Sequence, residues 1–421
     1  MNEVRSHAVR GWCPGALRPM PSGDGLIARL RPRTGAFPLG DVLTIAGMAG
    51  RHGNGLIDLT RRANLQMRGV RPEALPALWN DLRAAGMLDD NIEAEAVRNV
   101  MVGPLAGVDP TETMDVRPIA REIERYLTED EGLWRLPAKF CIIVDGGGLL
   151  TLDRERADIR LEAVRVGSGI AVAIGLDGVG WVGATSEQAA AAVAMHAARA
   201  FLAVATDARS RMRDLTDDAR ERLRSTLAPH LEPLYGPPAG EEPRCSLGRV
   251  ADGSATIAAG FAAPFGRIEA GVLSTLAAAA LELGASEMRL SPWRILYVPL
   301  SNEQAVADLC ALAATSGLVT DARDPLLAID ACPGAAGCRS TSLETRAAAR
   351  QLASMLEALG CRSAHVSGCA KGCARSKAAD LVLVGAGNCY GVLRHDTARG
   401  ETHLFVAPAR LAELPVILEA S

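Results

Sequence analysis

Four cysteines near the C-terminal end carry the clearest chemical signal in the sequence. They form two pairs, Cys332 and Cys338 with five residues between them, and Cys369 and Cys373 with three. Mostly small residues, mainly Gly and Ala, separate the members of each pair, so the backbone is free to close around a bulky group. Thiolates are the ligands that soft metals and iron-sulfur clusters prefer. The two pairs together predict one four-thiolate site for a 4Fe-4S cluster.

Zinc and disulfide bonds are the alternatives for these cysteines. Structural zinc sites favour the tighter C-x2-C to C-x4-C spacings, which the first pair exceeds. Disulfides are rare in the cytoplasm, and the N-terminal sequence lacks the apolar segment and cleavage site of a secretory signal. No stretch reaches membrane-spanning length without charges or glycines. We therefore expect a cytoplasmic protein that does not bind membranes, with most of its other cysteines buried.

Composition limits the classes of function. A chain of 421 residues is too long to form a single hydrophobic core of ordinary size, so we expect two to four domains. A share of 48% hydrophobic and 22% charged residues is typical of globular proteins. Aromatic residues make up only 4% of the chain and the net charge is −4. Stacking surfaces and strong positive charge are what nucleic-acid binding requires. We therefore expect no nucleic-acid partner.

The second half of the chain repeats landmarks of the first. Three pairs of residues share one offset of 231 positions: Gly53 and Gly284, Leu59 and Leu290, and Gly86 and Gly317. Gly25 additionally resembles Gly266, with a shorter connection. The repeat predicts two similar α+β halves around a pseudo-twofold axis, with a site where they meet.

Hydrophobic periodicity predicts the local elements of the first half. We expect a strand at 23–32, a helix ending at Gly53, one strand over 55–70, a helix over 73–85, a strand beginning at 92, a helix over 116–128, a strand before the glycines at 146–148, hairpins over 150–182, a helical segment over 186–227, and a linker over 232–244.

The strand predicted over residues 55–70 carries a polar stripe. Arg62, Asn64, Gln66 and Arg68 alternate along it, and alternation on a strand places side chains on one face. The guanidinium group of arginine offers a planar pair of donors that matches a carboxylate. The stripe therefore suits an anionic ligand, although a solvated strand face has the same pattern.

These motifs resemble the siroheme-dependent sulfite and nitrite reductase superfamily. The family's cluster cysteines have the same C-x5-C and C-x3-C spacings, and its Arg-x-Asn-x-Gln motif is similar to residues 62–66. Its Arg-Asn-Val loop is similar to residues 98–100, and its Leu-Pro-x-Lys-Phe strand to residues 136–140. The resemblance implies that Arg62, Arg98 and Lys139 are catalytic, and that they bind the substrate together with Asn64, Gln66 and Arg68.

The resemblance also implies a fold. We expect a duplicated sulfite/nitrite reductase-like α+β architecture, with two ferredoxin-like half-domains and two α/β modules about a pseudo-twofold axis. The expected half-domains are residues 1–80 and 245–315. The expected modules are residues 81–231 and 316–421, the second of which binds the cluster, and residues 232–244 are the linker.

Residues 10–32, 59–70 and 136–148, together with the compact length of the chain, resemble one branch of the superfamily, the precorrin-3B synthases. Cys141 stands where sulfite reductases have a second Lys, and loss of this cation should weaken capture of a small dianion. The branch implies an O2-dependent monooxygenase that hydroxylates precorrin-3A at C-20 with γ-lactone formation, in aerobic cobalamin biosynthesis. It also implies NADH as the electron source, through a separate reductase because the chain lacks a convincing nucleotide motif. Oxygen activation implies iron at the cluster or a mononuclear non-haem iron.

Two alternative functions stay open. In a siroheme-dependent sulfite or nitrite reductase, Cys373 would bridge the cluster to siroheme, and Arg62, Arg98 and Lys139 would bind the oxyanion. A non-enzymatic tetrapyrrole-binding protein or electron carrier would need the four cysteines without the polar stripe. Siroheme bound to the protein would distinguish the first alternative, and a catalytic assay the second.

Overall fold

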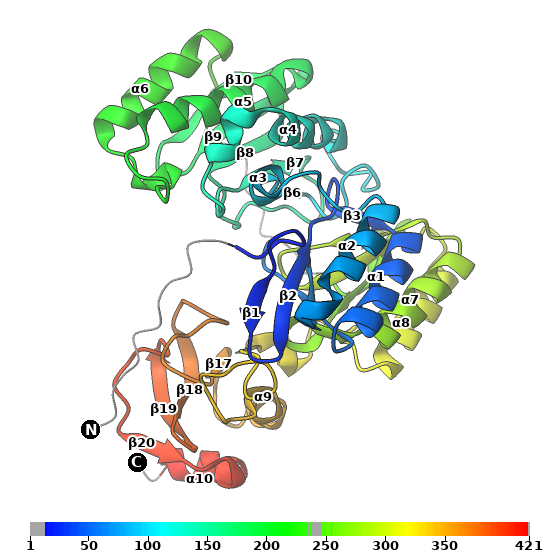
Figure 1. The fold of residues 1–421 in the computed structure, drawn as a ribbon, viewed down its shortest axis with the longest axis vertical. Coiled ribbons are helices and arrows are strands. Elements are labelled where there is room, and N and C mark those ends of the chain that lie inside the picture. Colours follow the sequence, from blue (N-terminus) through cyan, green and yellow to red (C-terminus); the bar gives the residue numbers. More distant parts are fainter. Residues whose placement is uncertain (1–12, 235, 237–245, 254, 420–421) are drawn as a thin grey trace.

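The computed structural model describes residues 13–234, 236, 246–253 and 255–419. Cys245, most of the predicted linker and the first twelve residues lie outside this range. The described chain forms four five-stranded sheets with helices packed on them (Figure 1). Figure 1 shows one α/β module at each end of the molecule and the two half-domains between them. No helix in the described ranges is long and apolar enough to cross a membrane.

Each half-domain sheet takes its last strand from the other half of the chain. The first sheet has the order β1 (Met20–Ser22), β2 (Gly25–Leu30), β5 (Leu65–Val70), β4 (Leu56–Leu59) and β13 (Arg267–Glu269). The second has the order β11 (Gly248–Asp252), β12 (Ala255–Ala262), β15 (Ile295–Pro299), β14 (Glu287–Leu290) and β3 (Ala36–Pro38). All pairings in both sheets are antiparallel. The exchange of β3 and β13 ties the halves together.

The two half-domains share one hydrophobic core. Their helices are α1 (Leu39–His52), α2 (Leu75–Ala84), α7 (Ala270–Glu282) and α8 (Glu303–Thr315). Residues from both halves, such as Ile57, Met67, Leu273 and Leu276, are fully buried in a single cluster. Burial of this apolar surface holds the halves in a fixed relation. The boundaries between domains stay a prediction.

The two modules have the same sheet topology. The first contains β6 (Val100–Val102), β7 (Ile142–Asp145), β8 (Ile159–Val166), β9 (Gly169–Leu176) and β10 (Gly180–Thr185), with α3 (Ile92–Val97), α4 (Arg117–Glu129), α5 (Glu187–Val204) and α6 (Asp217–Leu227). The second contains β16 (Ile329–Ala331), β17 (Ala364–Ser367), β18 (Ala379–Ala386), β19 (Cys389–Asp396) and β20 (Leu404–Val406), with α9 (Thr345–Ala353) and α10 (Leu414–Glu419). In each sheet the first three strands run parallel to one another, and each of the last two runs antiparallel to the strand before it.

The backbone confirms the predicted duplication at the offset of 231 residues. Non-glycine residues with positive φ recur at matching positions, Thr34 with Phe265 and Ala63 with Arg294. Such conformations are uncommon for these residues, so two matched pairs are strong evidence of a repeat. The suggested match of Gly25 to Gly266 is wrong. Gly266 precedes β13 as Gly35 precedes β3, because the earlier strand β2 corresponds to β12.

Two predicted elements differ from the structure. Residues 55–70 form a hairpin, β4 and β5, rather than one strand, because the chain turns at residues 60–64 with Ala63 in the left-handed region. The stretch that begins at Ile92 is the helix α3 rather than a strand. The Asn91 side chain accepts a hydrogen bond from the Ala94 amide at 2.6 Å and caps this helix.

Candidate functional site

The structure brings the four cysteines of the two pairs to one edge of the second module. Cys332 and Cys338 lie in the loop after β16, and Cys369 and Cys373 lie in the loop after β17. These strands are parallel neighbours, so their carboxyl ends meet. The pKa of the Cys373 thiol is raised, first by desolvation and then by the other three thiols. The four sulfur atoms therefore lie close enough to interact electrostatically.

Backbone amides point at two of the sulfur atoms. The Gly368 amide donates to Cys332 Sγ at 3.2 Å, and the Ser340 amide donates to Cys338 Sγ at 3.5 Å. A Cβ atom at position 368 would lie 2.4 Å from Thr341 Cγ2, so this position needs glycine. Hydrogen bonds to thiolate sulfur stabilise negative charge and tune the potential of bound clusters. The loops are built as a cradle for thiolates.

The donor set fits a cluster better than a single ion. Among the described residues, no group of three or more His, Cys, Asp or Glu side chains converges closely enough to hold one metal ion. A cubane cluster binds each thiolate through a different iron, so it needs four thiols around a cavity rather than four thiols at one point. The two cysteine loops bring four thiols within electrostatic reach of one another, which is compatible with a cluster. The mononuclear iron stays a prediction without ligands in the described chain.

Arg68 links the first half-domain to the loop after β16 that carries Cys332 and Cys338, which we call the cluster loop. Its side chain is buried, and Nη2 donates to the Gly337 carbonyl at 3.1 Å and to Ser22 Oγ at 3.0 Å. Nη2 and Nε also bind the Asp24 carboxylate at 2.7 and 3.1 Å. Ser22 Oγ itself donates to the same Gly337 carbonyl at 3.0 Å. These contacts engage the Arg68 guanidinium with the protein rather than leaving it open to a ligand.

The turn between β4 and β5 places Arg62 and Asn64 away from the expected stripe. Thr60 Oγ1 accepts hydrogen bonds from the amides of Arg62 and Asn64 at 3.2 and 3.1 Å, which fixes the turn. Arg62 Nη2 donates to the Lys139 carbonyl at 3.1 Å. Within the described chain, Arg62 Nη1 and Asn64 Nδ2 are buried without a hydrogen-bond partner. The prediction that all four polar side chains share one face of a strand is wrong for Arg62 and Asn64. Both side chains still have donors without acceptors.

Two further arginines belong to this site, and the sequence analysis missed them. Arg29 lies on β2, next to β5, and Arg31 is the first residue after the end of β2. With its amide oxygen toward Arg29, Gln66 accepts from Nη2 and Nε at 2.8 and 3.1 Å. Burial lowers the pKa of Arg29, and the charge of Arg62 lowers it further. The alternation of Arg in GLIARLRP was the signal for this pair.

Arg31 is a buried charge that keeps unused donors. Burial lowers its pKa to about 10. Its Nη1 lies 3.7 Å from Glu95 Oε1, and in the described structure neither Nε nor Nη1 has a hydrogen-bond partner. A buried guanidinium group without acceptors is costly, so these donors are oriented for a ligand. We call Arg29, Arg31, Arg62, Asn64 and Gln66 the first-half site.

The other predicted residues lie at the edge of the first-half site. Arg98 is buried and pairs with Asp89, Nε to Oδ1 at 3.0 Å and Nη2 to Oδ2 at 2.7 Å. Its Nη1 reaches the Pro32 carbonyl at 3.4 Å, so the backbone that follows Arg31 is fixed by Arg98. Lys139 has an exposed side chain next to Arg62. Arg98 therefore supports the site, whereas Lys139 is free to meet a ligand.

Cys141 is part of the hydrophobic interior of the first module. Its side chain is fully buried, and burial raises the pKa of its thiol. Its amide donates to Asp158 Oδ2 at 2.9 Å, and Asp158 forms a buried ion pair with Arg211. The thiol therefore cannot supply the positive charge that a lysine would bring to this position.

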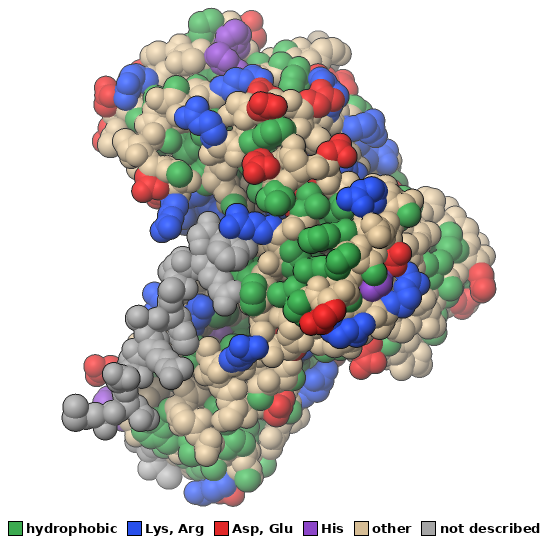
Figure 2. Space-filling view, in the orientation of Figure 1, with side chains coloured by type: hydrophobic (Ala, Val, Ile, Leu, Met, Phe, Trp, Pro, Cys, Tyr) green, Lys and Arg blue, Asp and Glu red, His purple; other side chains and the backbone are tan. Residues whose placement is uncertain are grey.

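Arg62 and Arg68 connect the first half-domain to the two modules. Arg68 on β5 contacts the cluster loop, while Arg62, in the turn before that strand, contacts the first module through the Lys139 carbonyl. Figure 2 shows the molecule hollowed between the two modules, with Lys and Arg side chains along the margin. The two arginines therefore join the first half-domain to the module on each side of it.

Comparison with known proteins gives this arrangement a family. Residues 18–85 match the nitrite/sulfite reductase ferredoxin-like half domain, and residues 93–229 match the nitrite and sulphite reductase 4Fe-4S domain. Precorrin-3B synthase from Sinorhizobium sp is 34% identical over 397 residues, which cover 93% of this chain and 84% of that protein. This chain belongs to the precorrin-3B synthase family of the nitrite and sulfite reductase superfamily.

More distant members of the superfamily match shorter stretches or the fold alone. Ferredoxin–nitrite reductase from Leptolyngbya laminosa is 33% identical over 34% of this chain and 28% of its own. The structure of the Mycobacterium tuberculosis NirA protein has a TM-score of 0.73 and 21% identity, and the match covers 94% of this chain and 80% of that one. The duplicated α+β fold expected from the sequence is thereby confirmed.

The family match also clarifies the two modules. The stretch that matches the 4Fe-4S domain is the first module, whose one cysteine is Cys141. The four clustered cysteines lie in the second module, which has the same sheet topology. In this chain the four clustered cysteines therefore belong to the second module, not to the module that matches the 4Fe-4S domain.

Proposed function

We propose that this protein acts in the cytoplasm as a precorrin-3B synthase. In this reaction one oxygen atom of O2 enters C-20 of precorrin-3A, and a ring A acetate closes a γ-lactone onto C-1. The second oxygen atom leaves as water, and NADH supplies two electrons through a separate reductase. The similarity to the Sinorhizobium enzyme over nearly the whole chain supports this assignment.

The buried donors of the first-half site are the single observation that carries the proposal. Arg31 Nε and Nη1, Arg62 Nη1 and Asn64 Nδ2 are buried in the described structure without acceptors. A tetrapyrrole of the precorrin type carries acetate and propionate carboxylates around its edge. Each carboxylate that reaches a guanidinium group contributes roughly 1.5 to 3 kcal/mol of binding. A ligand with several carboxylates supplies the missing acceptors.

The residues of the site then have separate tasks. Arg31 and Arg62 bind carboxylates of the macrocycle, and Asn64 donates a further hydrogen bond. Lys139, whose backbone carbonyl binds Arg62, is an exposed residue with an ammonium group suited to proton transfer at the edge of the bound ligand. Arg98 and Arg68 position the strands and the cluster loop. A 4Fe-4S cluster on Cys332, Cys338, Cys369 and Cys373, when bound, supplies electrons singly.

A siroheme-dependent reductase is the second candidate, favoured by the similarity to ferredoxin–nitrite reductase in the first half. The buried Cys141 argues against sulfite, because the position lacks a cation that would attract a dianion. Under this reading the first-half site would hold siroheme as a resident group rather than a substrate.

The absorption spectrum of anaerobically purified protein separates the two candidates. Iron, acid-labile sulfide and extractable tetrapyrrole are measured on the same sample. The synthase predicts broad iron-sulfur absorbance with no bound tetrapyrrole, because the macrocycle enters and leaves as substrate and product. Sharp siroheme bands, with siroheme equimolar to the chain, would replace the synthase with a nitrite or sulfite reductase.

A further inference from the structure

The second half of the chain contains a cavity at the position that corresponds to the first-half site. At the offset of 231 residues, Ala262 takes the place of Arg31, Trp293 that of Arg62, and Arg294 that of Ala63. All three residues of the second half line one cavity of about 280 Å³. The positions that carry Arg31 and Arg62 in the first half thus carry an alanine and a tryptophan in the second, in a cavity whose lining combines apolar side chains with charged ones. We call it the second-half cavity.

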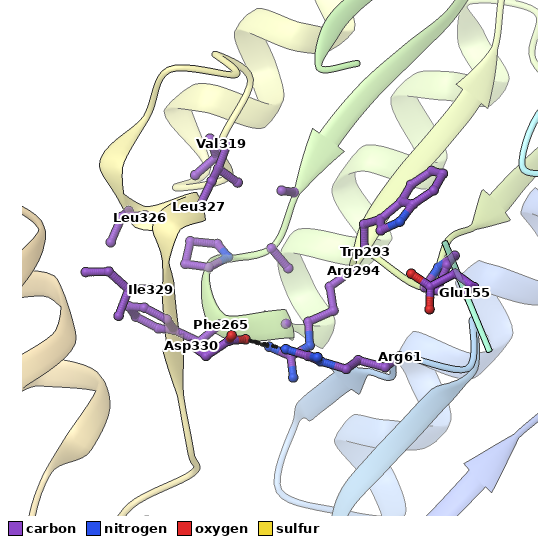
Figure 3. A pocket seen from close by; sticks show the side chains of 15 residues that line it. Arg61, Glu155, Phe265, Trp293, Arg294, Val319, Leu326, Leu327, Ile329 and Asp330 are labelled. Atoms are coloured by element: carbon purple, nitrogen blue, oxygen red, sulfur yellow. Dashed lines mark hydrogen bonds and ion pairs between the residues drawn. The ribbon is translucent and has the colours of Figure 1, made fainter. Parts of the chain in front are cut away.

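The walls of the second-half cavity are apolar on two sides. Figure 3 shows Val319, Leu326 and Leu327 on one side and Trp293 on the other. Leu327 is 40% exposed, so part of this apolar wall is open to solvent. Indole rings and leucine side chains suit the flat faces of an organic molecule. The cavity is shaped for an apolar body.

One edge of the cavity carries more positive than negative charge. Asp330 is approached by three guanidinium groups, Arg61 at 2.8 Å, Arg375 at 3.3 Å and Arg294 at 3.6 Å. Figure 3 shows Arg61 and Arg294 together with Asp330 along this edge. One carboxylate cannot neutralise three cations. Glu155 also lines the cavity beside Trp293, where burial raises the pKa of its carboxyl group and Arg61 lowers it. With Glu155 included, three guanidinium groups still face only two carboxyl groups.

Arg294 is held in place for this edge. Its backbone has φ 65°, a conformation that costs energy for a non-glycine residue. A Cβ atom at Gly266 would lie 2.5 Å from Arg294 Cδ, so the glycine leaves the room that the side chain fills. Arg294 Nε is buried with no hydrogen-bond partner in the described structure. Burial also lowers the pKa of this arginine. Its charge is only partly compensated by Asp330.

We propose that the second-half cavity binds a small organic carboxylate with a flat apolar body, distinct from the ligand of the first-half site. The carboxylate faces Arg61 and Arg294, and the body lies between Trp293 and the leucine wall. The volume of about 280 Å³ is close to the lower end of small-molecule sites, about 300 Å³. A ligand of one or two rings fits, whereas a whole tetrapyrrole does not. The proposal stands whether or not the synthase assignment holds.

Calorimetric titration of the full-length protein with 1-naphthoate tests the proposal. The uncharged 1-naphthalenemethanol is the matched control for the carboxylate. Two variants remove the cations, Arg61→Gln at a half-exposed side chain and Arg294→Asn, because asparagine tolerates positive φ. Arg323→Gln is the matched control variant, since Arg323 is an exposed arginine that pairs only locally with Asp321.

The expected result is saturable binding of one naphthoate per chain. Affinity should fall about tenfold or more in Arg61→Gln and in Arg294→Asn, as the loss of a charged hydrogen bond predicts, and should be unchanged in Arg323→Gln. The alcohol should bind more weakly by a similar factor. Absence of saturable binding, or equal binding of the alcohol, would overturn the proposal. So would loss of binding in Arg62→Gln with retention in Arg61→Gln, because the probe would then occupy the first-half site.

Discussion

Arg68 Nη2 donates to the carbonyl of Gly337 at 3.1 Å, across 269 residues of sequence. Gly337 immediately precedes Cys338, so a residue of the first half-domain fixes the backbone beside a predicted cluster ligand. The contact is tight from both sides. A Cβ atom at Gly23 would lie 2.7 Å from the Cys338 amide nitrogen, and one at Gly337 would lie 2.8 Å from Arg68 Nη2. The cradle is therefore assembled between two domains.

Replacement of Arg68 by alanine should release the cluster loop. The change leaves the buried Asp24 carboxylate without its partner and removes two hydrogen bonds from the loop region. Breaking a buried pair in this way costs about 3 to 5 kcal/mol of unfolding free energy. Iron and acid-labile sulfide should fall after challenge with a chelator. Arg71→Ala, at an exposed arginine of the same segment, should keep both. Equal cluster retention in the two variants would show that Arg68 does not position the loop.

Replacement of Cys369 by alanine should abolish cluster binding. A cubane cluster that loses one of four thiolates is expected to be unstable or absent. The matched control is Cys389→Ala, at a partly buried cysteine on β19 of the same module. Iron and sulfide analysis of both variants should show loss only in the first. Full metal content in Cys369→Ala would remove this residue from the ligand set.

Replacement of Arg62 by alanine should weaken tetrapyrrole binding and leave the cluster intact. In the described structure Arg62 Nη1 is a buried donor without a hydrogen-bond acceptor, Nη2 donates to the Lys139 carbonyl, and the guanidinium group lowers the pKa of the nearby Cys141 thiol against the larger raising effect of burial. Loss of one carboxylate contact should raise the dissociation constant about tenfold to a hundredfold, which corresponds to roughly 1.5 to 3 kcal/mol. Titration with precorrin-3A, followed by absorbance, measures the effect. Arg121→Ala, at an exposed position of α4, is the control and should bind as wild type. An unaltered affinity in Arg62→Ala would count against the carboxylate contact.

The acidic interior of the first module should make stability depend on pH. Glu162 is 8% exposed on β8, and burial, followed by repulsion from Asp153 and Asp145, raises the pKa of its carboxyl group to about 8. The folded state thus keeps a proton that the unfolded chain loses near the ordinary glutamate value. The contribution of Glu162 to the free energy of unfolding is therefore greatest below the ordinary glutamate pKa. It falls as the pH rises from that value to about 8.

Chemical unfolding of wild type and Glu162→Gln at several pH values between about 5 and about 8 measures this effect. This range lies between the ordinary glutamate pKa and the raised pKa of Glu162 in the folded protein. For one such carboxyl, the slope approaches about −1.4 kcal/mol per pH unit inside the interval. The glutamine variant should lack that part of the slope. Glu187→Gln, at an exposed first-turn position of α5, should behave as wild type. Parallel pH profiles for wild type and Glu162→Gln would show that this carboxyl ionises normally.

The sequence predicted the parts of the molecule that depend on local pattern. The cysteine spacings indicated the cradle, and the offset of 231 residues indicated the duplication, because both are visible as repeated residue types. The turn at residues 60–64 was missed, since the left-handed conformation of Ala63 depends on the hydrogen bonds of Thr60. Exchange of β3 and β13 between the halves leaves no local signal at all.

The roles of individual arginines were also beyond the sequence. Arg62 and Arg68 look equivalent in the motif, but Arg68 is engaged by Asp24 and Gly337 whereas Arg62 keeps an unused donor. Arg31, which the motif analysis omitted, is buried and keeps two donors without hydrogen-bond partners in the described structure. Such differences arise from residues far apart in sequence that meet only in the folded chain. Residue types suggested the candidate site, and burial and partners distinguish the donors within it.

The most direct test of the account is the mass of the product formed under 18O2. Reconstituted protein is mixed anaerobically with precorrin-3A and a chemically or enzymatically reduced donor, and labelled oxygen is then admitted. The account predicts a product heavier than the substrate by one labelled oxygen atom, carrying a γ-lactone. It also predicts loss of this product in Cys369→Ala. An unchanged tetrapyrrole, alongside reduction of added nitrite or sulfite by the same protein, would contradict the central claim.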